Sequence, residues 1–192
     1  MSANASRNLE STGPTTRTIA FLSGIGIELV QVDSLEGAGF LEDVRVVAGA
    51  LHHLAGAKVC NLLHEAGHVA IVPTRFRHLM NDDVEIGTKG MFEQMEQEGI
   101  PPGSREWEIV LQVSEAEATA WSWAAGKAAG IPEELIIEDW CFNGEGSLTR
   151  LMLSAGRHYG VNGLAHAGFC RTREADRRPG QVYPHLNFWL QP

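Results

Sequence analysis

Hydrophobic residues come in short runs in the first third of the chain. The β-prone runs TIAFL, IELVQV and VRVVAGALHHL lie between Thr18 and about His53, and glycines separate them as turns. This pattern predicts two to four strands, at least some of them antiparallel, and we interpret the apolar stretch 18–30 as strand. Residues 1–16 are small and polar, which predicts a disordered N-terminal tail ahead of a single domain at 17–192.

The rest of the chain carries helical patterns. The segment at about 57–72 is apolar nearly all round and ends before Pro73, which predicts a buried helix in the middle of the domain. Ser104 can cap a long helix at 105–129, and shorter helices are expected after it. Strands first and helices afterwards predict an α+β fold with a small N-terminal sheet and a mainly helical C-terminal half.

Composition narrows the class of protein. With 44% hydrophobic and 20% charged residues, the 192-residue chain is typical of a folded domain. Its formal charge of -9 argues against a nucleic-acid partner, which normally selects a basic surface. Cys60, Cys141 and Cys170 form no CxxC pair, so free thiols in a reducing compartment are expected. Because the stretch 18–30 is too short to cross a bilayer, we predict a cytoplasmic protein with no membrane partner.

Three ionisable residues interrupt the apolar helix. His64, Glu65 and His68 form the motif HExxH. Histidines at i and i+4 lie about 40° apart on a helix and can bind one metal ion, while the adjacent glutamate is placed to take a proton from water. Burial of that carboxylate without a partner would be costly, and a divalent cation removes the cost. The motif therefore predicts a zinc site with Glu65 as general base.

A catalytic zinc site needs a third protein ligand. Glu115 and Glu117, in SEAEATAWSWAAG, lie on opposite faces of the helix expected there. Five apolar residues fall within about 40° of Glu117 on a helical wheel: Val110, Val113, Trp121, Ala124 and Ala128. The face of Glu115 carries Gln112, Thr119 and Ser122, among others, and is expected to meet water. We therefore predict Glu117 as the third ligand.

The motif also indicates a family. HExxH followed by a glutamate on a later helix resembles the gluzincin metallopeptidases, and EAEATAW resembles the ExEAnxFA segment of the ImmA/IrrE-type metallopeptidases. In that family the second glutamate binds zinc, so the resemblance, over about 42–125, implies a zincin-like fold with Glu117 as ligand. HEAGH is also the motif sequence found in FtsH-type peptidases, whose third ligand is an aspartate. Asp82, Asp83 and Glu115 therefore stay open as alternatives.

These observations predict a zinc-dependent hydrolase that cleaves a peptide, a protein or another amide. His158 and Tyr159 are expected to stabilise the oxyanion, with His166 and Tyr183 as alternatives. An edge strand near 44–50 could hold an extended peptide. A metal-binding regulatory protein without hydrolytic activity is the alternative function, and an HExxH oxidoreductase or a non-peptidic amidohydrolase also stays open. The oligomeric state is not predicted.

Overall fold

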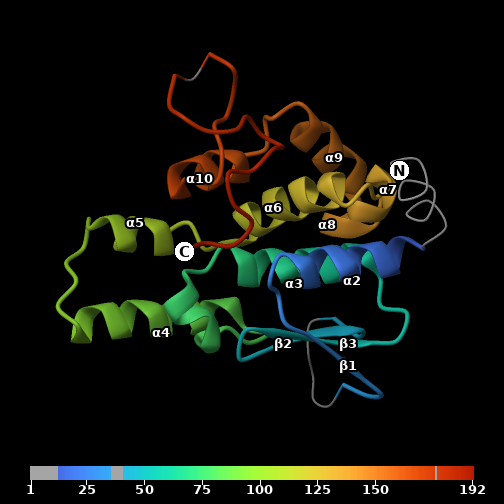
Figure 1. The fold of residues 1–192 in the computed structure, drawn as a ribbon, viewed down its shortest axis with the longest axis horizontal. Coiled ribbons are helices and arrows are strands. Elements are labelled where there is room, and N and C mark those ends of the chain that lie inside the picture. Colours follow the sequence, from blue (N-terminus) through green and yellow to red (C-terminus); the bar gives the residue numbers. More distant parts are fainter. Residues whose placement is uncertain (1–12, 36–40, 176) are drawn as a thin grey trace, which may run out of the picture.

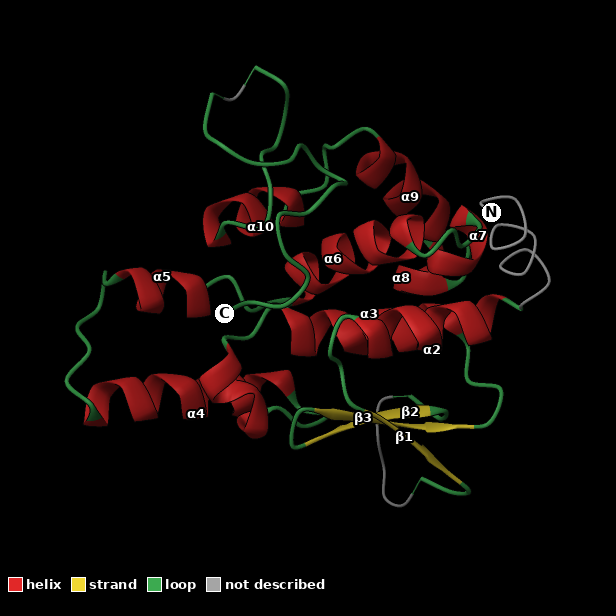
Figure 2. Cartoon of the chain, in the orientation of Figure 1, coloured by secondary structure: helices red, strands yellow, loops and turns green. Residues whose placement is uncertain are grey.

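The computed structural model describes residues 13–35, 41–175 and 177–192, and these form an α+β fold (Figures 1 and 2). The elements are α2 (Pro14–Gly24), β1 (Leu29–Val32), β2 (Val44–Val47), β3 (Ala50–Leu54), α3 (Val59–Ala70), the 3-10 helix η1 (Thr74–Leu79), α4 (Val84–Gln97), α5 (Arg105–Val110), α6 (Glu115–Ala128), α7 (Glu133–Ile136), α8 (Cys141–Gly144), α9 (Gly146–Ser154) and α10 (Gly160–Ala167). The predicted α+β class with a small sheet is confirmed and helices dominate after the sheet, but one helix, α2, precedes it.

The N-terminal apolar stretch is helical where a strand was expected. Residues 14–24 form α2, and only 29–32 form a strand. Pro14 occupies the first turn, where its missing N–H costs nothing. Thr18 and Leu22, four residues apart, are the buried positions, because that spacing places them on one face of a helix. The predicted tail therefore overlaps α2 at 14–16, and its first twelve residues lie outside the described part of the chain.

The sheet has the strand order β1-β3-β2. Strands β1 and β3 are parallel, whereas β2 and β3 form an antiparallel hairpin in which Val47 pairs with Ala50. The run VRVVAGALHHL is thus two strands joined by Ala48 and Gly49, which have φ angles of 48° and 84°. Two consecutive residues with positive φ form the type of turn that best fits the twist of a two-residue hairpin.

Ala48 is exposed and is a poor residue for a left-handed conformation. We expect Ala48→Asn to raise the free energy of unfolding by roughly 0.5–1 kcal/mol, because asparagine tolerates this conformation and Asn-Gly is the favoured hairpin pair. Ala48→Val should lower it, since a β-branched side chain is disfavoured there. Denaturant unfolding at constant m-value measures both changes, and an Ala48→Asn variant no more stable than the parent would contradict the strain argument.

Helix α3 lies between the sheet and α6 (Figure 1). The prediction of a buried helix at 57–72 is confirmed, with Leu62, Leu63 and Ala66 fully buried and the helix ending before Pro73. Asp43 fixes the beginning of α3, because its carboxylate accepts hydrogen bonds from the Lys58 backbone N–H at 2.8 Å and from Asn61 Nδ2 at 2.7 Å.

The predicted long helix at 105–129 is two helices, α5 and α6. Ser104 caps α5 as expected, and a second cap at Ser114, whose Oγ accepts from the Ala116 N–H, begins α6. Serine inside a helical pattern offers the backbone an alternative hydrogen bond, which explains the break. Residues 116–126 are all buried, because α6 packs against α3 on one side and α10 on the other (Figure 1).

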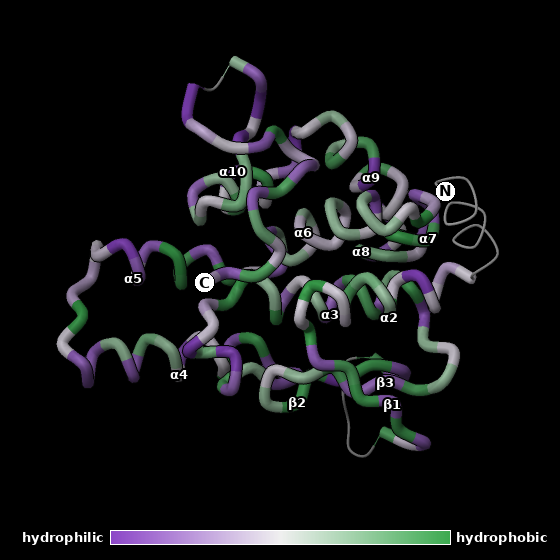
Figure 3. Tube along the Cα trace, viewed as in Figure 1, coloured by the Kyte–Doolittle hydropathy of each residue, from purple (hydrophilic) through white to green (hydrophobic). Residues whose placement is uncertain are grey.

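The C-terminal segment returns to the centre of the molecule. Gln191 N donates to Ala70 O at 2.9 Å, and Trp121 Nε1 donates to Trp189 O at 2.9 Å. Figure 3 shows that the loop after α10 is mainly hydrophilic and the strands mainly hydrophobic. Among the described helices, none has the length and hydropathy needed to cross a membrane.

Gly67, the glycine of HEAGH, is the point of closest approach between α3 and α6. A Cβ at Gly67 would lie 2.5 Å from the backbone oxygen of Ala118. We expect Gly67→Ala to lower the free energy of unfolding by about 1–3 kcal/mol, because one helix backbone must move away from the other.

Gly90, inside α4, supplies the matched control for this substitution. A Cβ there meets only Leu79 Cδ1, at 3.7 Å. Gly90→Ala should therefore raise the free energy of unfolding by about 0.5–1 kcal/mol through helix propensity. Equal effects of the two substitutions in denaturant unfolding would contradict the close-approach argument.

Candidate metal centre

His64 and His68 direct the same ring atom to one point. Their Nε2 atoms lie 3.2 Å apart, and the two rings meet edge to face. His68 Nδ1 is buried and has no hydrogen-bond partner in the described part of the chain, so every polar contact of that ring is made at Nε2. Two histidines one helical turn apart thus converge as the HExxH spacing predicts.

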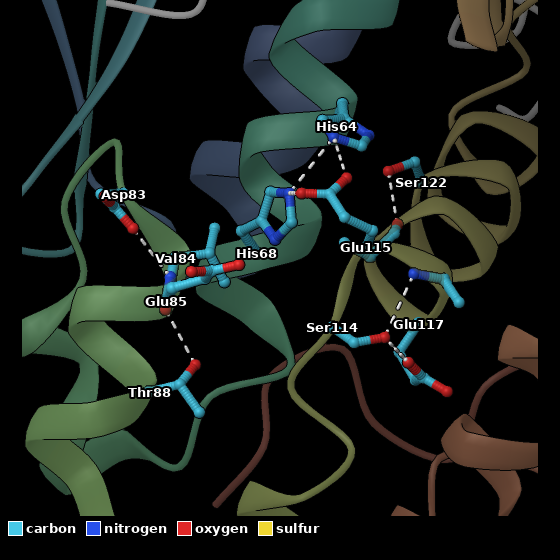
Figure 4. A network of polar contacts seen from close by, with 12 residues as sticks. His64, His68, Asp83, Val84, Glu85, Thr88, Ser114, Glu115, Glu117 and Ser122 are labelled. Atoms are coloured by element: carbon cyan, nitrogen blue, oxygen red, sulfur yellow. Dashed lines mark hydrogen bonds and ion pairs between the residues drawn. The ribbon is translucent and has the colours of Figure 1, made fainter.

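Glu115 completes the group from the first turn of α6 (Figure 4). Its Oε2 lies 3.2 Å from His64 Nε2 and its Oε1 lies 3.3 Å from His68 Nε2. With zinc-to-ligand bonds of about 2.1 Å, neighbouring ligand atoms of a tetrahedral site lie about 3.4 Å apart. The two Nε2 atoms, 3.2 Å apart, are close to that spacing, and Glu115 approaches each of them with a different carboxylate oxygen; one ligand atom from each residue can be chosen so that all three lie within 4.8 Å of one another.

The electrostatics of the three side chains are mutually supporting. Hydrogen bonds from His64 and His68 hold the pKa of Glu115 well below its usual range. Burial disfavours the charged form of His64, but Glu115 and Glu65 together raise the pKa of His64 above its ordinary value. Without a cation, the Glu115 carboxylate therefore favours the protonated, positively charged form of His64. A bound divalent ion would supply that positive charge instead.

The structure brings Glu115, and not the predicted Glu117, to the histidines. Glu117 lies on the opposite face of α6, where Ser114 Oγ donates to its carboxylate (Figure 4). A Cβ at Gly163 would collide with the Glu117 side chain, so this carboxylate packs against α10. Burial raises the pKa of Glu117.

The helical wheel places the two glutamates on opposite faces of α6, as the structure does, but its choice, Glu117, lies on the face that packs against α10, away from the histidines. It assumed one buried face, whereas α6 has two, and the one that meets α3 carries Glu115. A sequence signal for this was present. Ser114 and Glu117 have the S-x-x-E spacing of a capping box, which places Glu117 in a helix cap and Glu115 at the first helical position.

Glu65 is half-buried beside the ligands. Burial raises the pKa of its carboxyl, while His68 and His64 oppose that shift. Within the described residues, no side chain forms a hydrogen bond or ion pair with it. The carboxylate is thus free to accept a proton at the centre.

Asp82 and Asp83, the alternative candidates for the third ligand, have structural roles in the described chain. Asp82 pairs with Arg45 at 3.1 Å and accepts from Val46 N at 2.8 Å, and Asp83 caps α4. The predicted edge strand is β2, but Asp82 and Asn81 occupy the N–H groups of Val46 and Ala48. A peptide that adds to this edge would have to displace both side chains.

The expected oxyanion donors do not reach the histidine pair. His158 and Tyr159 stack on each other just before α10, which packs on the side of α6 away from α3 (Figure 1). His166 pairs with Glu108 at 3.4 Å, and the buried Tyr183 hydroxyl donates to Ala120 O at 3.0 Å. None of these four side chains lines either cavity at Glu115.

Two cavities meet at Glu115. One, of about 460 Å³, has apolar and thiol walls and contains His64; its other lining residues are Leu41, Cys60, Asn61, Thr119, Ser122, Ile136, Ile137, Trp140, Cys141, Phe142 and Asn143. The other, of about 650 Å³, runs along α4 and carries Glu85, Glu93 and Glu96 together with Lys89. His64 is therefore accessible from one of the cavities, whereas the His68 side chain is 2% exposed.

No protein-family model matches the chain, and neither a curated protein nor a solved structure matches it significantly. The case for a metal centre therefore rests on the geometry of His64, His68 and Glu115.

The two glutamates provide a matched test of the ligand set. We expect the purified protein to bind about one zinc ion per chain. Glu115→Gln should weaken zinc binding by about 100-fold or more, because removal of a direct ligand should lower the affinity more than removal of a residue that only hydrogen-bonds to a ligand. Glu117→Gln should bind zinc like the parent, since Glu117 faces α10. Chelator competition measures both affinities. The reverse ranking would restore Glu117 as ligand, and equal affinities of all three proteins would contradict the site.

Proposed function

We propose that the chain is a zinc-dependent hydrolase with a zincin-like fold, and that its reaction is cleavage of a peptide or another amide. The observation that carries this proposal is the cluster of His64, His68 and Glu115, whose ligand atoms lie within 4.8 Å of one another, beside Glu65, which has no hydrogen bond or ion pair among the described residues. Two imidazoles and one carboxylate are a ligand set that zinc uses in catalytic sites, with a fourth position left open.

Each residue of the centre has a separate part in this proposal. His64, His68 and Glu115 would hold the ion, which when bound supplies a Lewis acid and lowers the pKa of water. Glu65 takes the proton from the attacking water and returns it to the leaving nitrogen. The raised pKa of Glu65 suits a group that must accept and release a proton.

The surroundings fit a substrate that extends to both sides of the centre. Cavities of about 460 and 650 Å³ are within the usual size range of ligand sites. The first offers mainly apolar walls to an uncharged side chain, and the second combines apolar walls with several carboxylates and Lys89. A peptide chain can fill both at once, which favours a peptide over a small amide.

A metal-binding regulatory protein without hydrolytic activity is the second candidate. The same three ligands would serve it, and an ion held between α3 and α6 would then have a structural role. Glu65 distinguishes the two, because a purely structural site has no use for a carboxylate free of partners.

Glu65→Gln is the variant that tests the reaction. We expect it to keep zinc and to lose hydrolysis of a peptide pool by about 100-fold to 10,000-fold, the usual contribution of a general base. Glu117→Gln, which removes a charge on the opposite face of α6, should cleave the same peptides as the parent. Mass spectrometry of the digested pool gives both results.

Two outcomes would count against the enzyme. If Glu65→Gln cleaves as fast as the parent, Glu65 is not the base. If the zinc-loaded parent cleaves no peptide in a pool of varied sequence, the result supports the regulatory role instead.

A further inference from the structure

Two of the three cysteines lie together beside the candidate metal centre. Cys60 belongs to α3, one turn before His64, and Cys141 begins α8. Both line the 460 Å³ cavity that contains His64. All three cysteines are free thiols, and the third, Cys170, is buried in the loop after α10. The chain thus combines one thiol pair with one isolated thiol.

The two thiols of the pair lie in the wall of one cavity and share Glu138 as a neighbour. Glu138 Oε1 lies 3.4 Å from the Cys60 sulfur, and the Glu138 backbone oxygen accepts from Cys141 N at 3.0 Å. The interaction of the two thiols raises the pKa of Cys60 far above its ordinary value and lowers that of Cys141 to about 7. Cys60 is buried, whereas Cys141 is half-exposed in the cavity wall. A small reagent can therefore reach Cys141 first.

The backbone around Cys141 is held in an unusual conformation. Phe142 and Asn143 have φ angles of 55° and 58°, in the left-handed region. Such a conformation is unfavourable for phenylalanine and tends to occur at functional sites. It turns Phe142 toward the centre, with its ring centroid 6.4 Å from that of His64. The short helix α8 thus contributes the Cys141 thiol and the Phe142 ring to the lining of the cavity.

We propose that Cys60 and Cys141 form a reversible disulfide by exchange with a low-molecular-weight disulfide, and that this bond fastens α8 to α3 beside the histidine pair. A disulfide needs sulfur atoms about 2.05 Å apart, so Cys141 must move toward Cys60 for the bond to form. The exposed side chains of α8 leave room for that movement, whereas Cys60 is fixed in the core. The proposal does not depend on a bound metal or on hydrolysis.

The Cys60–Cys141 disulfide forms in two thiol–disulfide exchange steps. The Cys141 thiolate attacks one sulfur of the small disulfide, and the other half leaves as a thiolate. Cys60 then gives up its proton to solvent, its sulfur attacks that of Cys141, and the second small thiolate leaves. The protein loses two protons and two electrons, and the small disulfide receives the two electrons.

The test uses the reduced full-length protein and oxidised glutathione. After incubation, free thiols are alkylated in denaturant and the digested chain is mapped by mass spectrometry. We expect two of the three thiols to be lost together, a peptide that links Cys60 to Cys141, and an alkylated Cys170. Reduced glutathione in excess should restore all three thiols.

Matched serine variants separate the roles of the thiols. Cys170→Ser should form the same link as the parent, because burial raises the pKa of Cys170 to about 12 and keeps it out of the exchange. In Cys141→Ser, Cys60 should stay free. Three results would each overturn the proposal: three alkylated thiols in the parent, a lasting glutathione adduct on Cys141 without a link, or a link that includes Cys170.

Discussion

The close contact between α3 and α6 is the constraint on which the metal centre depends. Gly67 leaves room for the backbone of Ala118, and the buried Ser122 hydroxyl lies 2.8 Å from Leu63 O and 2.7 Å from Ala118 O. Each helix is rigid along its own axis. Fixing the contact at Gly67 therefore also fixes His68, the next residue, relative to Glu115, which lies one turn before Ala118. The separations between Glu115 and the two histidines are therefore a consequence of helix packing.

The same packing gives the centre two unequal sides. His68 is held in the interface at 2% exposure, whereas the Glu115 side chain is 69% exposed where two cavities meet. Rigid ligands on the buried side and open space on the other are what a catalytic site needs, because the substrate must reach a position that the protein does not fill. Burial also explains the raised pKa of Glu65.

Much of the fold could be predicted, and the failures have local causes. The buried helix, the strands before it and the cap at Ser104 follow from apolar spacing and turn chemistry. The prediction of a strand at 18–30 is wrong at 18–24, because the β-prone residues there conceal the i, i+4 spacing of Thr18 and Leu22. The segment 105–129 was treated as one helix, although Ser114 and Glu117 have the spacing of a helix cap.

The sequence by itself determined which chemistry the chain can offer. His64 and His68 converge because residues four apart share a helix face, and Glu65 accompanies them for the same local reason. The identity of the third carboxylate is a property of tertiary structure. Glu115 and Glu117 are two residues apart on opposite faces of α6, and both faces are buried against other helices. Only the packing of α3 on one face and α10 on the other decides which carboxylate meets the histidines.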